Sequence, residues 1–289
     1  MLSPEEIDRY RRDGFLLVEN ALSGDEVAAM RAEIARIVER ARGLEEGDDV
    51  FEFEDGHSPD APRVRRIKKP HQVAPFFRDL LAIPRVIEPV TDLLGPNVRL
   101  QSSKLNMKSA EYGASVEWHQ DWAFYPHTND DILAIGIFVD DVDTENGPLM
   151  AVPGSHRGPV LDHHHGGVFC GAVDPGAEGV DLDRAVRLTG PAGSMSIHHV
   201  RTLHGSDFNR SGRSRGLLLY ELTAADAWPL VGTMSPFGGL EEYDGRMVAG
   251  EPTLAPRLES VPVRMPLPMP ADVTSIYQAQ KRAGQKAFT

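Results

Sequence analysis

Two histidines and an aspartate are the residues whose spacing suggests metal chemistry. His119 and Asp121 lie two positions apart in the segment WHQDWAFYP, and no other histidine in the chain has an acidic residue two positions after it. On an extended segment, residues i and i+2 point to the same side. An imidazole nitrogen and a carboxylate oxygen could therefore bind one ion.

A third ligand has to come from another part of the chain. His204 is favoured because it lies between two expected strands, 194–200 and 214–222, while His198 and His199 remain near rivals. Two histidines and one carboxylate on one face of an octahedral ion form the facial triad of non-haem Fe(II) oxygenases. This triad leaves three positions open for an oxo acid and dioxygen.

An arginine and a serine downstream of the third histidine could hold such an oxo acid. If the chain turns back through GSDFNRSG after His204, Arg215 on the next strand can project into the same cavity. Its planar guanidinium would bind a distal carboxylate through two parallel hydrogen bonds, and Ser206 could add a hydroxyl. This arrangement favours His204 over its rivals and predicts a 2-oxoglutarate site.

Three sequence blocks carry a resemblance to a known family. They are WHQD (118–121), ENGPLMAVPGSHRG (145–158), and HGS followed by an arginine eleven positions after its histidine. Over roughly residues 1–225 the chain resembles the phytanoyl-CoA dioxygenase superfamily of Fe(II)/2-oxoglutarate oxygenases. The resemblance implies a double-stranded β-helix, a cupin-like jelly roll. It also implies a hydroxylase that oxidises an unactivated C–H bond of a small molecule with O2 and releases succinate and CO2.

The same resemblance implies roles for individual residues. It assigns Fe(II) to His119, Asp121 and His204, and 2-oxoglutarate to Arg215 and Ser206. Related hydroxylases also hold the cosubstrate at the position that Asn106 occupies here, in SKLNMK. These assignments are expectations about this chain.

The elements that must position these residues can be read from the sequence pattern. Capping boxes at Ser3 and Ser23 predict helices to about residue 12 and over 24–42, and 84–94 reads as another helix. Short strands are expected at 14–20, 63–69, 97–109, 131–140, 148–153, 186–190, 194–200 and 214–222. Helices followed by many short strands predict an α+β fold with flanking N-terminal helices.

We expect one oxygenase domain over residues 1–289. Residues 1–96 would form a mainly helical flank with a mobile acidic loop at 43–62, and residues 97–225 the β-helix core. Residues 226–289 contain many prolines, which remove donors from a sheet, so they should form a wrap or lid.

Several residues are candidates for the substrate pocket. Tyr125 and Trp122 follow the metal pair, and the tyrosine hydroxyl could orient a ligand. The basic run RVRRIKK reads as a solvated strand face, on which Arg66 and Lys68 share a side, so one of them could reach the cavity. Whether the substrate is a free metabolite or a coenzyme A thioester stays open.

The bulk composition excludes some functions. The net charge of −13 argues against nucleic acid or an anionic membrane as the main partner. No apolar run long enough to span a bilayer occurs, so we expect a cytoplasmic protein. The pattern does not predict an oligomeric state.

Two alternatives belong to other functional classes. Histidine and carboxylate ligands also suit zinc, so a zinc hydrolase or lyase on a similar barrel is possible. In that case Arg215 and Ser206 would have no cosubstrate to bind. The other alternative is a non-catalytic small-molecule binder, against which an intact triad argues.

Overall fold

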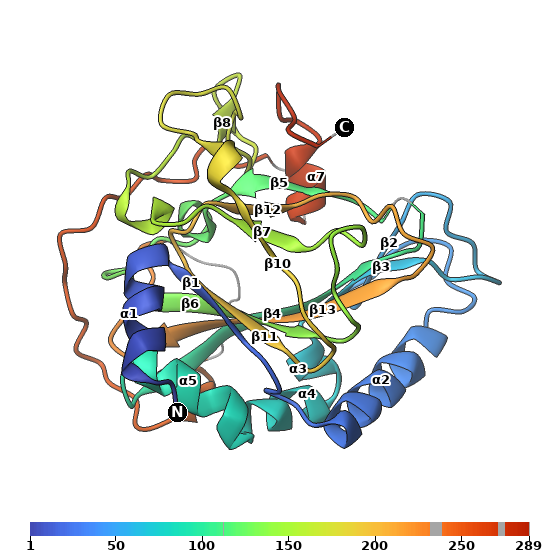
Figure 1. Cartoon of the computed structure of the whole chain (residues 1–289), viewed down its shortest axis with the longest axis horizontal. Coiled ribbons are helices and arrows are strands. Elements are labelled where there is room, and N and C mark those ends of the chain that lie inside the picture. The colour runs from blue at the N-terminus through green and yellow to red at the C-terminus, as the bar shows by residue number, and fades with distance from the viewer. Residues whose placement is uncertain (112, 232–238, 271–274, 289) are drawn as a thin grey trace.

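The architecture consists of two antiparallel sheets that lie face to face, with helices on the outer side of the larger one (Figure 1). This computed structural model describes residues 1–111, 113–231, 239–270 and 275–288. The main sheet has the order β1 (Phe15–Val18), β11 (Met195–His199), β6 (Ile132–Phe138), β13 (Arg215–Ala224), β4 (Val98–Lys108), β3 (Val64–Lys68) and β2 (Phe51–Phe53). The smaller sheet has the order β10 (Val186–Leu188), β7 (Leu149–Ala151), β12 (His204–Ser206) and β5 (Val116–His119). In addition, β14 (Met247–Ala249) pairs with β4, and β8 (His164–His165) pairs with β9 (Val168–Phe169).

The N-terminal helices cover the outer side of the main sheet. They are α1 (Pro4–Asp13), α2 (Gly24–Glu39), α3 (Pro70–Val73), α4 (Pro75–Asp79) and α5 (Pro84–Leu94). Both predicted capping boxes are present, at Ser3 with Glu6 and at Ser23 with Glu26. The face of α2 that contains Val27, Met30, Ile34 and Ile37 is buried in the main core. No helix in the described ranges is long and apolar enough to cross a membrane.

The central strands of the main sheet are covered on both faces. All seven residues of β6 and all ten of β13 are buried. Helices pack on one face and the smaller sheet faces the other (Figure 1). The continuous apolar run ILAIGIF follows from this burial, because neither side of the strand meets water.

The segment up to residue 96 also contributes to the main sheet. Its strands β1, β2 and β3 join that sheet, with β1 paired to β11 and β3 to β4. The expectation of a loop throughout 43–62 is wrong at β2, where Phe51 is buried and pairs with Ile67. The acidic surroundings of FEF hide this short strand in the sequence. The α+β class is confirmed.

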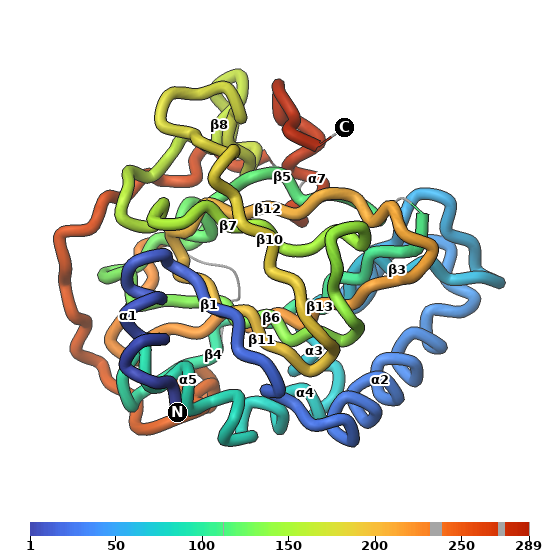
Figure 2. The backbone as a smooth tube through the Cα atoms, viewed as in Figure 1, coloured from blue at the N-terminus to red at the C-terminus, as the bar shows by residue number. Residues whose placement is uncertain are grey.

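The segment after β14 runs along the outside of the molecule. Figure 2 shows residues 250–270 running up one side. The helix α7 (Ile276–Gln280) lies beside β5. The amide of Gln280 makes hydrogen bonds to the backbone N–H and carbonyl of Glu117 in β5, at 2.9 and 3.2 Å. The C-terminal segment is therefore tied to the strand that ends at His119.

Candidate metal centre and substrate cavities

Three residues far apart in the sequence converge between the two sheets. His119 ends β5, Asp121 begins the short 3-10 helix η2 (Asp121–Ala123), and His204 begins β12. His119 and His204 are direct partners in the pairing of these neighbouring strands. One ligand atom from each of the three residues lies within 4.8 Å of the other two. Among the described residues this is the only group of three or more histidine, cysteine or acidic side chains with such spacing.

The two imidazoles are oriented for metal binding. Nδ1 of His119 lies 2.8 Å from the carbonyl of Glu117, and Nδ1 of His204 lies 2.9 Å from the carbonyl of Thr202. Because a carbonyl only accepts, each Nδ1 carries the proton and each Nε2 presents a lone pair. These Nε2 atoms lie 3.5 and 3.9 Å from Oδ1 of Asp121. The three atoms fit one divalent ion.

The protonation states agree with this geometry. Burial holds the pKa of His204 well below its usual value, so its ring is neutral near pH 7. Burial opposes ionisation of Asp121, but His204, His119 and His198 nevertheless hold the pKa of its carboxyl well below its usual value. A neutral imidazole and an ionised carboxylate are the forms that bind a metal.

The two rival histidines occupy different positions. His198, on β11, has its Nε2 atom 3.5 Å from Oδ2 of Asp121, and its ring centroid lies 4.3 Å from that of His204. His199 instead faces Asp130, with its Nε2 atom 4.0 Å from a carboxylate oxygen. Neither belongs to the group of converging ligand atoms.

A narrow cavity between the sheets adjoins the triad and contains the predicted cosubstrate residues. Asn106, Ser206 and Arg215 all line it. Arg215 is buried, its guanidinium donates to the carbonyl of Gly147, and its Nε atom has no hydrogen-bond partner. The Oδ1 atom of Asn106 is also buried without a partner. Buried polar atoms without partners are costly, which fits a cavity built for a polar ligand.

Lys108 is a second buried cation in this cavity that the sequence reasoning missed. It is the cross-strand partner of Arg215 and lines the same space. Its ammonium donates to the carbonyls of Ser206, at 3.4 Å, and Asp207. Burial, and next the other cation, lower the pKa of Lys108, and burial lowers that of Arg215 to about 10. Two adjacent buried cations suit a dicarboxylate.

A second cavity of about 290 Å³ shares Asp121 with the first. Its other lining residues come from the main sheet, from the segments after the metal pair and from the C-terminal segment: Arg66, Ser102, Lys104, Phe124, Tyr125, Phe169, Glu221, Met269, Ser275, Ile276 and Ala279. Burial, followed by the nearby Asp121, raises the pKa of Tyr125 well above its usual value, so its hydroxyl keeps its proton.

The structure does not bring Trp122 into this cavity, because its ring is fully buried in the core and Nε1 donates to the carbonyl of Pro262 at 2.8 Å.

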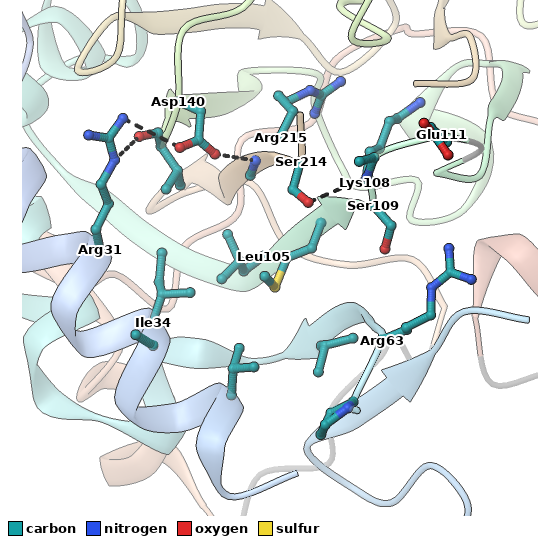
Figure 3. Close-up of a pocket in the computed structure, with 18 residues that line it drawn as sticks. Arg31, Ile34, Arg63, Leu105, Lys108, Ser109, Glu111, Asp140, Ser214 and Arg215 are labelled. Atoms are coloured by element: carbon teal, nitrogen blue, oxygen red, sulfur yellow. Dashed lines mark hydrogen bonds and ion pairs between the residues drawn. The ribbon is translucent and has the colours of Figure 1, made fainter. Parts of the chain in front are cut away.

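A cavity of about 840 Å³, larger than the two described above, lies on the other side of the main sheet (Figure 3). Arg31 and Ile34 project into it from α2, and Arg31 pairs with Asp140 at 3.4 Å. In Figure 3 the charged ends of Lys108 and Arg215 are turned away from α2. None of the three converging ligands lines this cavity, so size alone does not locate the chemistry.

Comparisons with known proteins agree with this geometry. The family model described as phytanoyl-CoA dioxygenase (PhyH) matches residues 10–217, which is most of the chain. The chain belongs to this family. A probable alpha-ketoglutarate-dependent hypophosphite dioxygenase of Stutzerimonas stutzeri is 37% identical, over 98% of this chain and 99% of the relative. An L-proline trans-4-hydroxylase of Streptomyces griseoviridis is 33% identical, over 79% of this chain and 89% of the relative.

Solved structures show that the fold is shared as well. The crystal structure of EctD from S. alaskensis with bound Fe superposes with a TM-score of 0.68 at 24% identity, covering 90% of this chain and 88% of that one. The protein is an Fe(II)- and 2-oxoglutarate-dependent dioxygenase. The alternatives of a zinc enzyme and of a non-catalytic binder therefore give way to this assignment.

Proposed function

We propose that this dioxygenase hydroxylates an unactivated C–H bond of a small molecule and releases succinate and CO2. One oxygen atom of O2 would enter the product and the other would enter succinate, so that the substrate and 2-oxoglutarate are both oxidised. The observation that carries the proposal is the convergence of His119, Asp121 and His204 beside the buried guanidinium of Arg215. The two facing sheets would form the double-stranded β-helix typical of such enzymes.

In this proposal each residue has a defined task. His119, Asp121 and His204 hold Fe(II), and Arg215, Ser206 and Asn106 hold 2-oxoglutarate. Fe(II), when bound, supplies the redox chemistry that couples decarboxylation of 2-oxoglutarate to substrate oxidation. The protein orients the substrate and excludes water.

The second cavity would bind the substrate, because it meets the first at Asp121. The phenolic hydroxyl of Tyr125 would orient the substrate there, since burial keeps it protonated and able to donate. A substrate in this cavity would lie next to the metal while 2-oxoglutarate fills the narrow space between the sheets.

A second candidate is oxidation of a P–H bond. It is favoured by the 37% identity to the probable hypophosphite dioxygenase along almost the whole chain. With hypophosphite, the same reaction would give phosphite, succinate and CO2. The triad and the cosubstrate residues would serve either substrate without change.

Succinate formation tests the proposal. The purified protein with Fe(II), 2-oxoglutarate and O2 should form succinate when a substrate is present, and the His119→Ala variant should not. Product identification then separates the two candidates, since phosphite and a hydroxylated metabolite are distinct. Absence of Fe(II)-dependent 2-oxoglutarate binding would contradict both.

A further inference from the structure

We propose that Arg66 binds an anionic group of the substrate in the second cavity. The substrate would then be a small molecule that carries a carboxylate or a phosphorus oxyanion, and not a coenzyme A thioester. This inference rests on the proposed oxygenase function, whose substrate class it specifies.

Arg66 differs from its charged neighbours in having no ion pair with another described residue. Arg65 pairs with Glu54 at 2.9 Å, and Lys104 pairs with Glu221 at 2.9 Å. The Nε atom of Arg66 is buried and has no hydrogen-bond partner, and no ion pair of Arg66 occurs in the described part of the chain. An unpaired guanidinium in a cavity wall is a ready binding group for an oxyanion.

Strand geometry directs this side chain to the cavity. On β3, Arg65 and Ile67 are buried on one face, and Arg66 lies on the opposite face, as residue alternation requires. Arg66 is the cross-strand partner of Asn106, which lines the cosubstrate cavity. Arg66 itself lines the second cavity together with Asp121. Its charge is thus available to a ligand that reaches the metal centre.

The charge balance of the wall also favours an anion. Glu221 neutralises Lys104, and Asp121 belongs to the group of converging ligand atoms. Among the described residues that line this wall, Arg66 is then the cation that no acidic residue pairs with. Ser102 adds a hydroxyl group that can donate to the same anion.

The size of the cavity favours a small substrate. A volume of about 290 Å³ is at the lower end of the range for small-molecule sites, roughly 300–1,000 Å³. The part of an acyl thioester that would react carries no charge, so it would leave Arg66 buried without a partner. A small oxyanion or a small carboxylate fits the volume of the cavity and would pair with the charge of Arg66.

Direct binding tests this inference. The anaerobic complex with Fe(II) and 2-oxoglutarate is titrated with hypophosphite, with L-proline and with L-prolinamide, which lacks the carboxylate. Binding is followed by the visible absorption of the complex. The same absorption confirms that each variant binds Fe(II) and 2-oxoglutarate. The variants are Arg66→Gln and Lys68→Gln, a matched control because Lys68 lies on the same strand face but donates to the carbonyl of Asp48.

We expect hypophosphite or L-proline to bind, with an affinity that falls as salt is added. Arg66→Gln should weaken that binding about tenfold to a hundredfold, the value of a lost charged hydrogen bond. Lys68→Gln should change it by no more than about twofold. The inference is overturned if neither probe binds, if Arg66→Gln binds as tightly as the wild type, or if L-prolinamide binds as tightly as L-proline.

Admitting O2 separates this inference from the proposed function. Anion binding without any succinate formation would contradict the oxygenase activity but leave the anion site in place. Succinate formation with an uncharged substrate, and no binding of either anion, would contradict the anion site alone.

Discussion

The Nε2 atom of His198 lies 3.5 Å from Oδ2 of Asp121, whereas Oδ1 of the same carboxylate faces the other two histidines. The two oxygens of one carboxylate thus have different neighbours. Both ring nitrogens of His198 lack a hydrogen-bond partner, so a slightly shorter separation would make this contact a hydrogen bond. That bond would hold Oδ2 and leave Oδ1 for the metal, which keeps Asp121 a one-oxygen ligand.

Replacing His198 by phenylalanine tests this positioning role. Phe keeps a ring but removes both nitrogens, so we expect Fe(II) affinity to fall about tenfold to a hundredfold, as for other outer-shell partners of metal ligands. Anaerobic titration with Co(II), used in place of Fe(II), measures the metal affinity of each variant. His198→Asn, which keeps a donor, should recover part of the loss. Unchanged affinity in His198→Phe would show that Asp121 is held by other contacts.

Arg215→Lys should weaken the binding of 2-oxoglutarate but not the binding of Fe(II). Lysine keeps the charge but loses the planar fork, so one charged hydrogen bond, about 1.5–3 kcal/mol, is lost. The KM for 2-oxoglutarate should rise roughly tenfold to a hundredfold, with Fe(II) affinity unchanged. The matched control is Arg213→Lys, because Arg213 is exposed and pairs with Asp143 outside the cavity. Equal effects of the two variants would contradict the assignment.

Gln280→Ala should weaken metal binding although Gln280 is not one of the three converging ligands. The Gln280 amide and Nδ1 of His119 both donate to the carbonyl of Glu117, and Gln280 also accepts from the N–H of Glu117. Removing the amide leaves that buried N–H without a partner, at a cost of about 1–3 kcal/mol. We expect weaker Fe(II) binding and faster amide exchange at Glu117. Lys281→Ala, on the exposed side, should alter neither.

His127 should make the protein less stable in acid. It is fully buried, Nδ1 donates to the carbonyl of Tyr125 at 2.8 Å, and burial lowers the pKa of His127 to about 4. In the unfolded chain the pKa is about 6.5, so the unfolded state binds a proton that the folded state does not as the pH falls from 6.5 to 4. The free energy of unfolding is therefore highest above this pH range and falls as the pH decreases through it.

Denaturant unfolding at pH 6.5 and pH 5 measures the effect. Loss of this titration in His127→Gln should reduce the difference in unfolding free energy between the two pH values by about 2 kcal/mol. A difference as large as that of the wild type would mean that His127 is protonated in the folded protein.

Local patterns were sufficient to predict α1, α2, most strands of the main sheet and the ligand candidates, but not β2 or β12. Capping boxes located α1 and α2, and alternation placed His119 and Asp121 on one side because Gln120 between them is extended. Alternation fails after Asp121, where the chain enters η2. Trp122 therefore turns into the core, which no strand pattern could predict.

The positions of other site residues depend on contacts between segments that are far apart in the sequence. Lys108 is the last residue of β4, an ordinary strand, and is buried only because β12 and the loop after it cover its ammonium. The sequence indicated that Arg66 or Lys68 could reach the cavity, but the choice depends on Asp48, whose carbonyl binds Lys68. The place of α7 beside β5 has no signal in the proline-rich segment before it.

The tie between Glu117 and Gln280 spans 163 residues and so has a consequence for biosynthesis. The ribosome makes both histidines and the aspartate well before it makes α7. A nascent chain therefore carries all three ligands while the carbonyl that orients His119 still lacks its second donor. We expect tight iron capture to begin only after translation has passed residue 280.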